Sequence, residues 1–536
     1  MSTRSLFPDP EPVEGVRFAD YFCDAVAVYG EEIAIEDPAT GETLNFDAIA
    51  QRIDDVRRRL IALGLAKGDS VGCLAGNSLS FVLLCLAAGQ LDLTLFPLNP
   101  ASKKYEIAKY LSGVRWLFID EEQREKAEAV AASIPDLKSI FALEALSAPP
   151  SFTIEEEAEE KETFDSETTA FVFFSSGTTG PPKGIRIPHR ALINHCQIAR
   201  ALATSPLSDL PQLPQLSSAD VVYGCLPLFH AGGIVSLLVQ LMQGARVILN
   251  GRYEEEVFVK TIVERKITVL NAVPAVLPVL SSLPAESDLS SLRLLFVGAA
   301  PVPPVEARAL QERIPACQLV QMYGLTEAGV LVFMTPAGVD AAVAVGVPLP
   351  GVEYKILKDD DEPAPPQHPG ELWLKTATMA SGYWQGEDFP EWLDTGDVAA
   401  VDENGLVSIV GRSKDMIKVR GWQVSPQELE QAIVAGVPGV TDCAVVGVDF
   451  GNGRLPHAFV VGMPIIDEVI NFVKDNFVSY KHLAGVSIVP ELPRTETGKV
   501  QRTALIQTTT ADDDSVFPVP KEGEEDTDER SEPVIL

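Results

Sequence analysis

The chain has 536 residues, 46% of them hydrophobic, and a formal net charge of −34. This acidity excludes a nucleic-acid-binding surface as the expected function, because such surfaces are strongly basic. It also means that a site for an anionic ligand must supply its own positive charge locally.

The length predicts more than one domain, and the apolar stretches and the termini predict a cytoplasmic protein. The longest apolar stretch, 81–89, is too short to span a bilayer, so we expect no membrane insertion. The first residues show no signal-peptide pattern, and the last three are not a peroxisomal address. The seven cysteines are scattered without CxxC spacing, which favours buried thiols in a reduced compartment and no zinc site.

Strand and helix patterns alternate along the first part of the chain. Helical spacing of apolar residues predicts a helix within 45–65, with Gly64 as its stop signal. A short strand within 69–76 precedes the helix at 79–89, and further strands are expected within 93–100, 116–120 and 221–228. This alternation predicts an α/β fold with largely buried sheets. We expect the acidic stretch 154–167 and the Pro/Ser/Leu-rich stretch 204–218 to be surface loops.

The pattern changes after about residue 392. Residues 398–410 predict a β-hairpin that turns at Asn404 and Gly405. A small α+β unit follows, with helices expected at 425–435 and 467–478 and strands at 441–448, 457–463 and 485–489. We therefore expect an N-terminal domain over 1–411 and a C-terminal domain over 412–510. The tail 511–536 carries ten acidic and two basic residues, which is typical of a disordered end.

The stretch 171–184 places hydroxyls and glycines directly after an apolar strand. A Walker A loop needs Gly before its lysine, but here Pro181 and Pro182 precede Lys183 and remove two backbone donors. Hydroxyls, the remaining amides and the charges of Lys183 and Arg186 would instead grip a polyphosphate; the alternative is a hydroxyl-rich turn with an exposed lysine. The phosphate contacts that we expect are Ser175, Ser176, Gly177, Thr178, Thr179, Gly180 and Lys183.

Seven segments together resemble the signatures of the adenylate-forming superfamily, in the expected order. They are FSSGTTGPPKGI (174–185), LPLFHAGG (226–233), VGAAP (297–301), QMYGLTEAG (321–329), WLDTGD (392–397), GRSKDMIKVRGWQVSPQELE (411–430) and LPRTETGKVQR (492–502). The sixth is most similar to 4-coumarate–CoA ligase-like and luciferase-like acyl-CoA synthetases. The resemblance implies a large N-terminal domain with a β-barrel-like subdomain and a small mobile C-terminal domain.

The resemblance also implies a reaction in two steps with ATP, Mg²⁺ and coenzyme A. A carboxylate attacks the α-phosphate of ATP, which gives an acyl-adenylate and pyrophosphate, and a thiol then displaces AMP. By resemblance, Glu327 is the magnesium ligand, Thr326 binds the α-phosphate, and Asp397 and Arg412 bind the ribose. The adenine would be surrounded by Ala300, Gln321, Met322, Tyr323 and Met334, with Met322 standing where the family usually has Gly.

The remaining roles implied by the resemblance belong to the acyl group, the thiol and the moving domain. Lys499 is the catalytic lysine, and rotation about Lys414 would replace it with residues of the second step. His230 would gate the acyl pocket, although a lone histidine in an apolar stretch is more often a core residue. The second-step residues are Lys418 and Gln423 as catalytic contacts and Gly421 and Trp422 in the thiol tunnel; the acyl pocket comprises Gly232, Gly233, Ser236, Val297 and Gly324.

The acceptor and the acid remain open at this level. No Arg or Lys lies within 229–236, so we expect an aromatic or medium-chain acid, and the paired glycines 232 and 233 suggest room for it. The alternative acceptors are an amine or a carrier protein acting in trans. A nucleotide-binding scaffold without catalysis would show decay at Lys499, Glu327 or Asp397, and all three are present.

Overall fold

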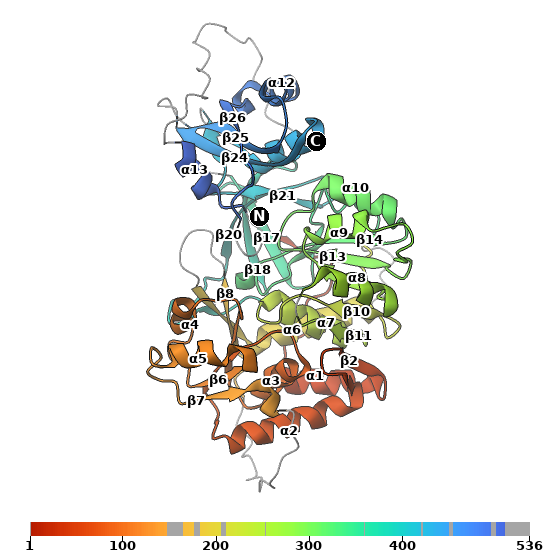
Figure 1. The fold of residues 1–536 in the computed structure, drawn as a ribbon, viewed down its shortest axis with the longest axis vertical. Helices are drawn as coiled ribbons and strands as arrows, with labels where there is room; N and C mark the ends of the chain where they lie inside the picture. The colour runs from red at the N-terminus through yellow and green to blue at the C-terminus, as the bar shows by residue number, and fades with distance from the viewer. Residues whose placement is uncertain are drawn as a thin grey trace.

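The computed structural model describes residues 2–146, 164–175, 183–204, 211–251, 253–358, 360–419, 422–449, 454–494 and 500–509. It shows two large, mostly parallel sheets with helices between and around them, an antiparallel sheet, and a small C-terminal unit (Figure 1). The mixed α/β class expected from the alternating pattern is confirmed. Among the described residues, none of the helices combines the length and the apolar character needed to cross a membrane.

The first large sheet has seven strands, of which β4 to β8 are parallel. Both faces of its central strands are covered, so Val71, Cys73 and Leu95 have no exposure, as expected for parallel strands. In spatial order the strands are β19 (Gly382–Tyr383), β9 (Lys183–Pro188), β8 (Thr169–Ser175), β5 (Thr94–Leu98), β4 (Ser70–Leu74), β6 (Trp116–Ile119) and β7 (Ser139–Ala142).

The second large sheet has nine strands, six of them parallel, with antiparallel strands at both edges. Its parallel strands end on the side that carries the segments resembling nucleotide and acyl contacts. In spatial order the strands are β16 (Val347–Pro348), β15 (Phe333–Met334), β14 (Gln318–Tyr323), β13 (Leu294–Val297), β12 (Val269–Ala272), β10 (Val221–Gly224), β11 (Arg246–Leu249), β2 (Ile33–Asp37) and β3 (Glu42–Asn45).

One layer of helices packs between the two large sheets and shares a single core with both. It comprises α1 (Phe18–Val26), α2 (Ile49–Ala62), α3 (Leu79–Gln90), α6 (His189–Thr204) and α7 (Ala231–Met242). The outer face of the seven-stranded sheet is covered by α4 (Lys104–Tyr110) and α5 (Arg124–Ala131). The outer face of the nine-stranded sheet is covered by α8 (Glu255–Glu264), α9 (Val276–Ser282) and α10 (Pro304–Arg313). The predicted helix within 45–65 is confirmed, and Gly64 after it adopts a φ of +93°.

The barrel-like subdomain expected from the resemblance corresponds to a five-stranded antiparallel sheet. Its strands alternate buried and half-buried residues, which is the pattern of a sheet with one covered face. The expected hairpin is confirmed, with Asp402 Oδ1 accepting hydrogen bonds from the backbone of Asn404 and Leu406 in its turn. The strands are β1 (Thr3–Arg4), β17 (Val352–Leu357), β18 (Gly370–Thr376), β20 (Leu393–Val401) and β21 (Val407–Arg412).

The C-terminal unit has a core of its own and lies beyond the antiparallel sheet (blue in Figure 1). Five of its elements match the predicted ones to within three residues at each end: α11 (Pro426–Gly436), β24 (Val440–Asp449), β25 (Arg454–Gly462), α12 (Ile466–Asn476) and β26 (Gly485–Ile488). The short strands β22 (Ile417–Val419) and β23 (Trp422–Val424) and the helix α13 (Arg502–Thr509) were not predicted. The boundary predicted after residue 411 stays a prediction, although β21 runs through Arg412.

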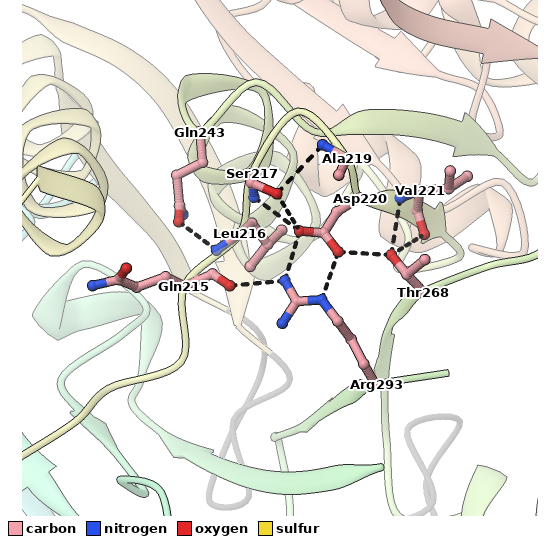
Figure 2. Close-up of polar contacts among 9 residues, drawn as sticks. All are labelled: Gln215, Leu216, Ser217, Ala219, Asp220, Val221, Gln243, Thr268 and Arg293. Atoms are coloured by element: carbon pink, nitrogen blue, oxygen red, sulfur yellow. Dashed lines mark hydrogen bonds and ion pairs between the residues drawn. The ribbon is translucent and has the colours of Figure 1, made fainter. Parts of the chain in front are cut away.

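The segment before β10 is packed against the protein rather than lying free on its surface. In the predicted loop 204–218, residues 205–210 lie outside the described ranges, but Leu213 and Leu216 are buried. Figure 2 shows the polar network that follows Leu216 in the chain: Asp220 accepts hydrogen bonds from Arg293 Nη2 at 2.6 Å, Thr268 Oγ1 at 2.8 Å and the Ser217 amide at 2.8 Å. Asp220 is 3% exposed, and its partners directly precede β12 and β13, so this network anchors the segment to the N-terminal ends of central strands of the nine-stranded sheet.

The acidic tail 511–536 and most of the acidic stretch 154–167 also lie outside the described ranges. All seven cysteines are described, and none forms a disulfide. Six are buried and Cys225 is half-buried, in line with the expectation of buried thiols. Burial raises the pKa of Cys225 to about 12.

Candidate active site

Two neighbouring strands, β20 and β21, bring Asp397 and Arg412 together. The two residues are direct partners across the antiparallel pair, and Arg412 Nε lies 2.9 Å from Asp397 Oδ1. Tyr323, at the end of β14, donates its hydroxyl to Asp397 Oδ2 at 2.6 Å. Asp397 is only 5% exposed, so its carboxylate is held in one orientation by groups from two different sheets. Burial, followed by the charge of Asp397, raises the pKa of Tyr323 well above its usual value.

The backbone around Asp397 is also fixed. Its amide donates to Thr395 Oγ1 at 3.1 Å, and Thr395 in turn donates to the Leu372 carbonyl at 2.7 Å. Gly396 adopts a φ of +66°, a backbone conformation that side-chain-bearing residues rarely take. Thr395 was not predicted from the sequence as a site residue, although its position two residues before Asp397 could have indicated it.

The segments after β13 and β14 form the expected adenine region. Ala300 is exposed, and Met322 and Tyr323 are half-buried, so these three border the surface. Gln321 and Met334 are 8% and 6% exposed and lie behind them.

Gln321 and Met334 are each engaged by protein. The Oε1 atom of Gln321 accepts a hydrogen bond from the Val302 amide at 3.0 Å, which fixes the loop that carries Ala300. Met334 is the cross-strand partner of Met322, since β15 pairs with the end of β14.

Glu327 lies in a single turn of 3₁₀-helix, η5 (Thr326–Ala328), directly after β14. Its backbone carbonyl accepts from the Ala380 amide at 3.1 Å, and Thr378 donates its hydroxyl to Ala328 O at 3.1 Å. The turn that holds Thr326 and Glu327 is therefore clamped by the residues that follow β18.

Lys183, at the start of β9, faces the same region. Its Nζ atom lies 4.5 Å from the centre of the Tyr383 ring, which is a cation–π contact. Burial, followed by the charge of Glu327, raises the pKa of Tyr383. Tyr383 thus links the predicted phosphate lysine and the predicted magnesium ligand, and no sequence signal pointed to it.

The phosphate loop itself lies mostly outside the described ranges. Residues 176–182 are not described, and of Ser175 only the backbone at the end of β8 is. Arg186, which the sequence analysis expected to add positive charge, forms an ion pair with Asp388.

His230 stands at the N-terminal end of α7, where its amide donates to Pro227 O at 3.1 Å and its ring lies 4.7 Å from that of Phe229. Asn77 holds the same loop from outside: its Oδ1 atom accepts from the Leu228 amide at 2.8 Å, and its Nδ2 atom donates to Leu226 O at 2.9 Å. Asn77 was missed by the sequence analysis, because its partners lie about 150 residues further along the chain.

The glycines of the predicted acyl pocket serve different purposes. A Cβ atom on Gly232 would meet only Val330 Cγ1, at 4.0 Å, so this position borders open space. A Cβ on Gly233 would clash with the Pro227 carbonyl, and one on Gly324 would clash with the Val330 carbonyl. The idea that both Gly232 and Gly233 provide room is therefore corrected: Gly233 lets α7 approach the preceding loop.

A small cavity of about 10 Å³, room for about one water molecule, lies beside α7 at the ends of β10, β11 and β12. Gly233 and Ser236 of the predicted acyl pocket line it, and Gln240 and Asn271 join them. Gly232 and Gly324 are not part of its wall, and Val297 is fully buried in the core on the other face of the sheet.

The predicted second-step residues lie in the C-terminal unit. Lys414 is exposed in the turn after β21, and Lys418 and Gln423 are direct partners across β22 and β23, next to the pair Val419 and Trp422. The side chains of Lys418, Trp422 and Gln423, and all of Gly421 and Lys499, lie outside the described part of the structure. Ser425 ties the start of α11 to the antiparallel sheet, since its hydroxyl donates to Val410 O at 2.6 Å.

Comparison with known proteins agrees with the motifs. The family described as AMP-binding enzyme matches residues 17–384, and its C-terminal domain family matches residues 428–499. A protein of Oryza sativa subsp. japonica named 4-coumarate–CoA ligase-like 4 is 30% identical, over 89% of this chain and 90% of its own length.

Solved structures show the same fold. The anthranilate CoA ligase AuaEII with anthranoyl-AMP has a TM-score of 0.80 at 25% identity, over 93% of this chain and 98% of its own. ATP-bound MatB from Rhodopseudomonas palustris has a TM-score of 0.78 at 24% identity, over 91% and 99%. The chain belongs to the AMP-binding enzyme family.

Proposed function

We propose that this protein is an AMP-forming acid–CoA ligase, which activates a carboxylic acid with ATP and passes the acyl group to coenzyme A. The observation that carries the proposal is the cluster at the end of β14. There Tyr323 and Arg412 orient the buried carboxylate of Asp397, and Glu327 lies four residues beyond Tyr323. Membership of the AMP-binding family and the relative named as CoA ligase-like support the same reaction.

In the first step, charge develops on the α-phosphate, so donors and cations must surround it. Asp397 would accept hydrogen bonds from the ribose hydroxyls, with Arg412 beside it. Thr326 would donate to the α-phosphate, and the hydroxyls of 175–179 with Lys183 would hold the leaving phosphates. Lys499 would neutralise the acid's carboxylate and the α-phosphate, a task that suits a long side chain with a point charge.

The residues present suit Mg²⁺ brought in with the nucleotide. Glu327 offers a half-buried carboxylate, the hard oxygen ligand that Mg²⁺ prefers together with phosphate oxygens and water. Over the described ranges no group of three or more His, Cys, Asp or Glu side chains is arranged to hold a metal. Glu327 would therefore share the ion with ATP, where the ion would neutralise phosphate charge.

In the second step the C-terminal unit would turn about Lys414. Lys499 would leave the site, and Lys418 and Gln423 would enter it, with Gly421 and Trp422 lining the path of the thiol. A domain that exchanges its residues between two steps acts as a lid, so its motion would set part of the turnover rate. A cytoplasmic location stays a prediction.

The test is acid-dependent exchange of pyrophosphate with ATP across a broad acid panel, followed by acceptor trials with coenzyme A, amines and carrier proteins. We expect exchange with some acids, and an acyl-CoA product that needs both ATP and acid. Exchange followed by transfer only to an amine or a carrier would refute the CoA step. The absence of exchange with every acid would refute the activation step as well.

A further inference from the structure

The turn η5, which carries the predicted magnesium ligand Glu327, is held at three successive backbone carbonyls. Those of Glu327 and Ala328 accept hydrogen bonds from the segment that follows β18, as described above. The next carbonyl, that of Gly329, is hydrogen-bonded to the side chain of His195 in α6. The third donor therefore comes from a different element than the first two, and it is a side chain that no sequence motif indicated.

His195 acts as an uncharged hydrogen-bond donor inside the protein. The residue is 3% exposed, and burial lowers its pKa to about 4, so the ring is neutral at neutral pH. A neutral imidazole carries one N–H, and a carbonyl oxygen can only accept, so the proton is on Nε2. The ring thus gives Gly329 a directed hydrogen bond without adding charge near Glu327.

Gly329 is the residue at which the turn closes. It adopts a φ of +85°, and a Cβ atom there would lie 1.9 Å from the Thr378 carbonyl oxygen. Its amide donates to Thr326 O at 3.1 Å, and the next amide, that of Val330, donates to Leu325 O at 2.9 Å. A hydrogen bond to the Gly329 carbonyl therefore restrains the whole turn.

The helix that carries His195 is tied to both sides of the predicted phosphate site. α6 begins directly after β9, the strand that starts at Lys183. Arg190 and Asn194 both donate to the Ala377 carbonyl, at 2.5 Å and 2.6 Å, and so hold the segment that clamps η5. One rigid helix thus connects the predicted phosphate lysine with the turn of the predicted magnesium ligand.

We propose that His195 is a positioning residue of the adenylation step, which fixes η5 so that Thr326 and Glu327 meet the phosphates and Mg²⁺ of ATP in one orientation. This inference rests on the proposed function and deepens it. His195 is buried, so it would act through the backbone of Gly329 rather than by touching the nucleotide. Placement matters because a shift of about 1 Å can cost roughly 100-fold in rate.

Two substitutions separate the hydrogen bond from the packing. His195→Leu keeps an apolar side chain in the core but has no donor. His195→Gln keeps a donor, because the amide nitrogen of glutamine lies the same number of bonds from Cβ as Nε2 of histidine. His189→Leu is the matched control: His189 is also buried on α6, at 0% exposure, but its Nδ1 atom accepts from the Phe18 amide of α1 at 3.1 Å.

Hydrogen exchange and ATP binding test the positioning without turnover. Amide exchange over residues 325–330 should be at least about threefold faster in His195→Leu than in the wild type. Titration calorimetry with Mg²⁺ and with excess EDTA gives two Kd values for ATP, and their ratio measures what Mg²⁺ contributes to binding. His195→Leu should reduce this ratio at least about threefold. His195→Gln and His189→Leu should stay within about twofold of the wild type in both readouts.

Pyrophosphate release with a good acid is the third readout. His195→Leu should lower kcat about tenfold or more, while KM for the acid stays within about twofold. His195→Gln should restore most of the lost kcat. His189→Leu should lose stability in urea, as His195→Leu does, but keep its kcat.

The outcomes separate this inference from the proposed function. No pyrophosphate release by the wild type with any acid would refute the activation step itself. Release by the wild type, together with unchanged exchange over 325–330 and an unchanged Kd ratio in His195→Leu, would overturn only the role of His195. So would equal losses in His195→Leu and His189→Leu, as expected if each histidine only stabilises α6.

Discussion

Replacing Asp397 with asparagine isolates the charge of the carboxylate that β20 presents to Tyr323 at the end of β14. The shape is kept, and the Tyr323 hydroxyl can donate to the amide oxygen as it does to Asp397 Oδ2 at 2.6 Å. The Arg412 side chain is 44% exposed, so it can be hydrated once its partner loses charge. Stability should therefore fall by no more than about 1–2 kcal/mol, and the main effect should appear in the use of ATP.

The magnitude follows from the strength of hydrogen bonds to charged groups. Such a bond is worth about 1.5–3 kcal/mol, against about 0.5–1.5 kcal/mol for a neutral pair. Two ribose hydroxyls would then lose about 2–3 kcal/mol together, which lowers kcat/KM for ATP by roughly 30- to 150-fold. The assay is pyrophosphate release with a good acid at varied ATP, with Asp394→Asn on the same strand as a control, because Asp394 is exposed.

Deoxynucleotides supply the result that would refute this reasoning. When 2′-deoxy-ATP replaces ATP, kcat/KM of the wild type should fall roughly tenfold, whereas that of Asp397→Asn should fall no more than about threefold. The reason is that the variant has already lost most of the hydrogen-bond energy that the 2′-hydroxyl contributes. Equal losses in both proteins would show that Asp397 does not contact that hydroxyl. An unchanged kcat/KM for ATP in Asp397→Asn would remove its role altogether.

Three further predictions concern the scaffold around the site. Asp220→Asn should lower the free energy of unfolding in urea by about 2–3 kcal/mol at pH 7, because Arg293 and Thr268 lose a charged acceptor. Burial alone would raise the pKa of Asp220, but the hydrogen bonds from Arg293, Thr268 and Ser217 outweigh it and lower that pKa. The stabilisation by the Asp220 carboxylate is therefore present above the unfolded pKa near 4 and is lost as the pH falls through the lower folded pKa. A difference in the free energy of unfolding between wild type and variant that stays constant from pH 7 to pH 3 would contradict this. Gly233→Ala should cost about 1–3 kcal/mol of stability by overpacking against Pro227, whereas Gly232→Ala, which faces open space, should cost much less; equal losses in urea would contradict the difference. Asn77→Ala should raise KM for the acid at least about threefold while KM for ATP changes little, because the loop 226–228 loses its hydrogen bonds to Asn77. A rise in KM for ATP alone would contradict a role of Asn77 in binding the acid.

The order and type of the elements could be predicted because they depend on local pattern. The helix that ends shortly before Gly64, the hairpin turning at Asn404 and Gly405, and five elements of the C-terminal unit each depend on residues that lie close together in the chain. Alternation of such elements is sufficient for the α/β class. The roles of the site residues came from resemblance to a family, because no local pattern says that Asp397 will meet Tyr323.

What could not be predicted depends on contacts between distant segments. Gly233 looked like space for a substrate, but the Pro227 carbonyl occupies the place of its side chain. The stretch 211–218 has the composition of a loop, yet Leu213 and Leu216 are buried because Asp220 and Arg293 hold the segment down.

The pairing of β2 with β11 has a consequence for how the chain is made. Ile35 lies beside Val247 in the nine-stranded sheet, although more than 200 residues separate them in sequence. A ribosome adds about 5–20 residues each second, so the hairpin of β2 and β3 waits on the order of 10–40 s for its neighbour to emerge. During that interval one edge of the hairpin has unpaired backbone groups, which other chains can join. Newly synthesised chains should therefore depend on chaperones more than refolded protein at high dilution does, because dilution removes the competing partners.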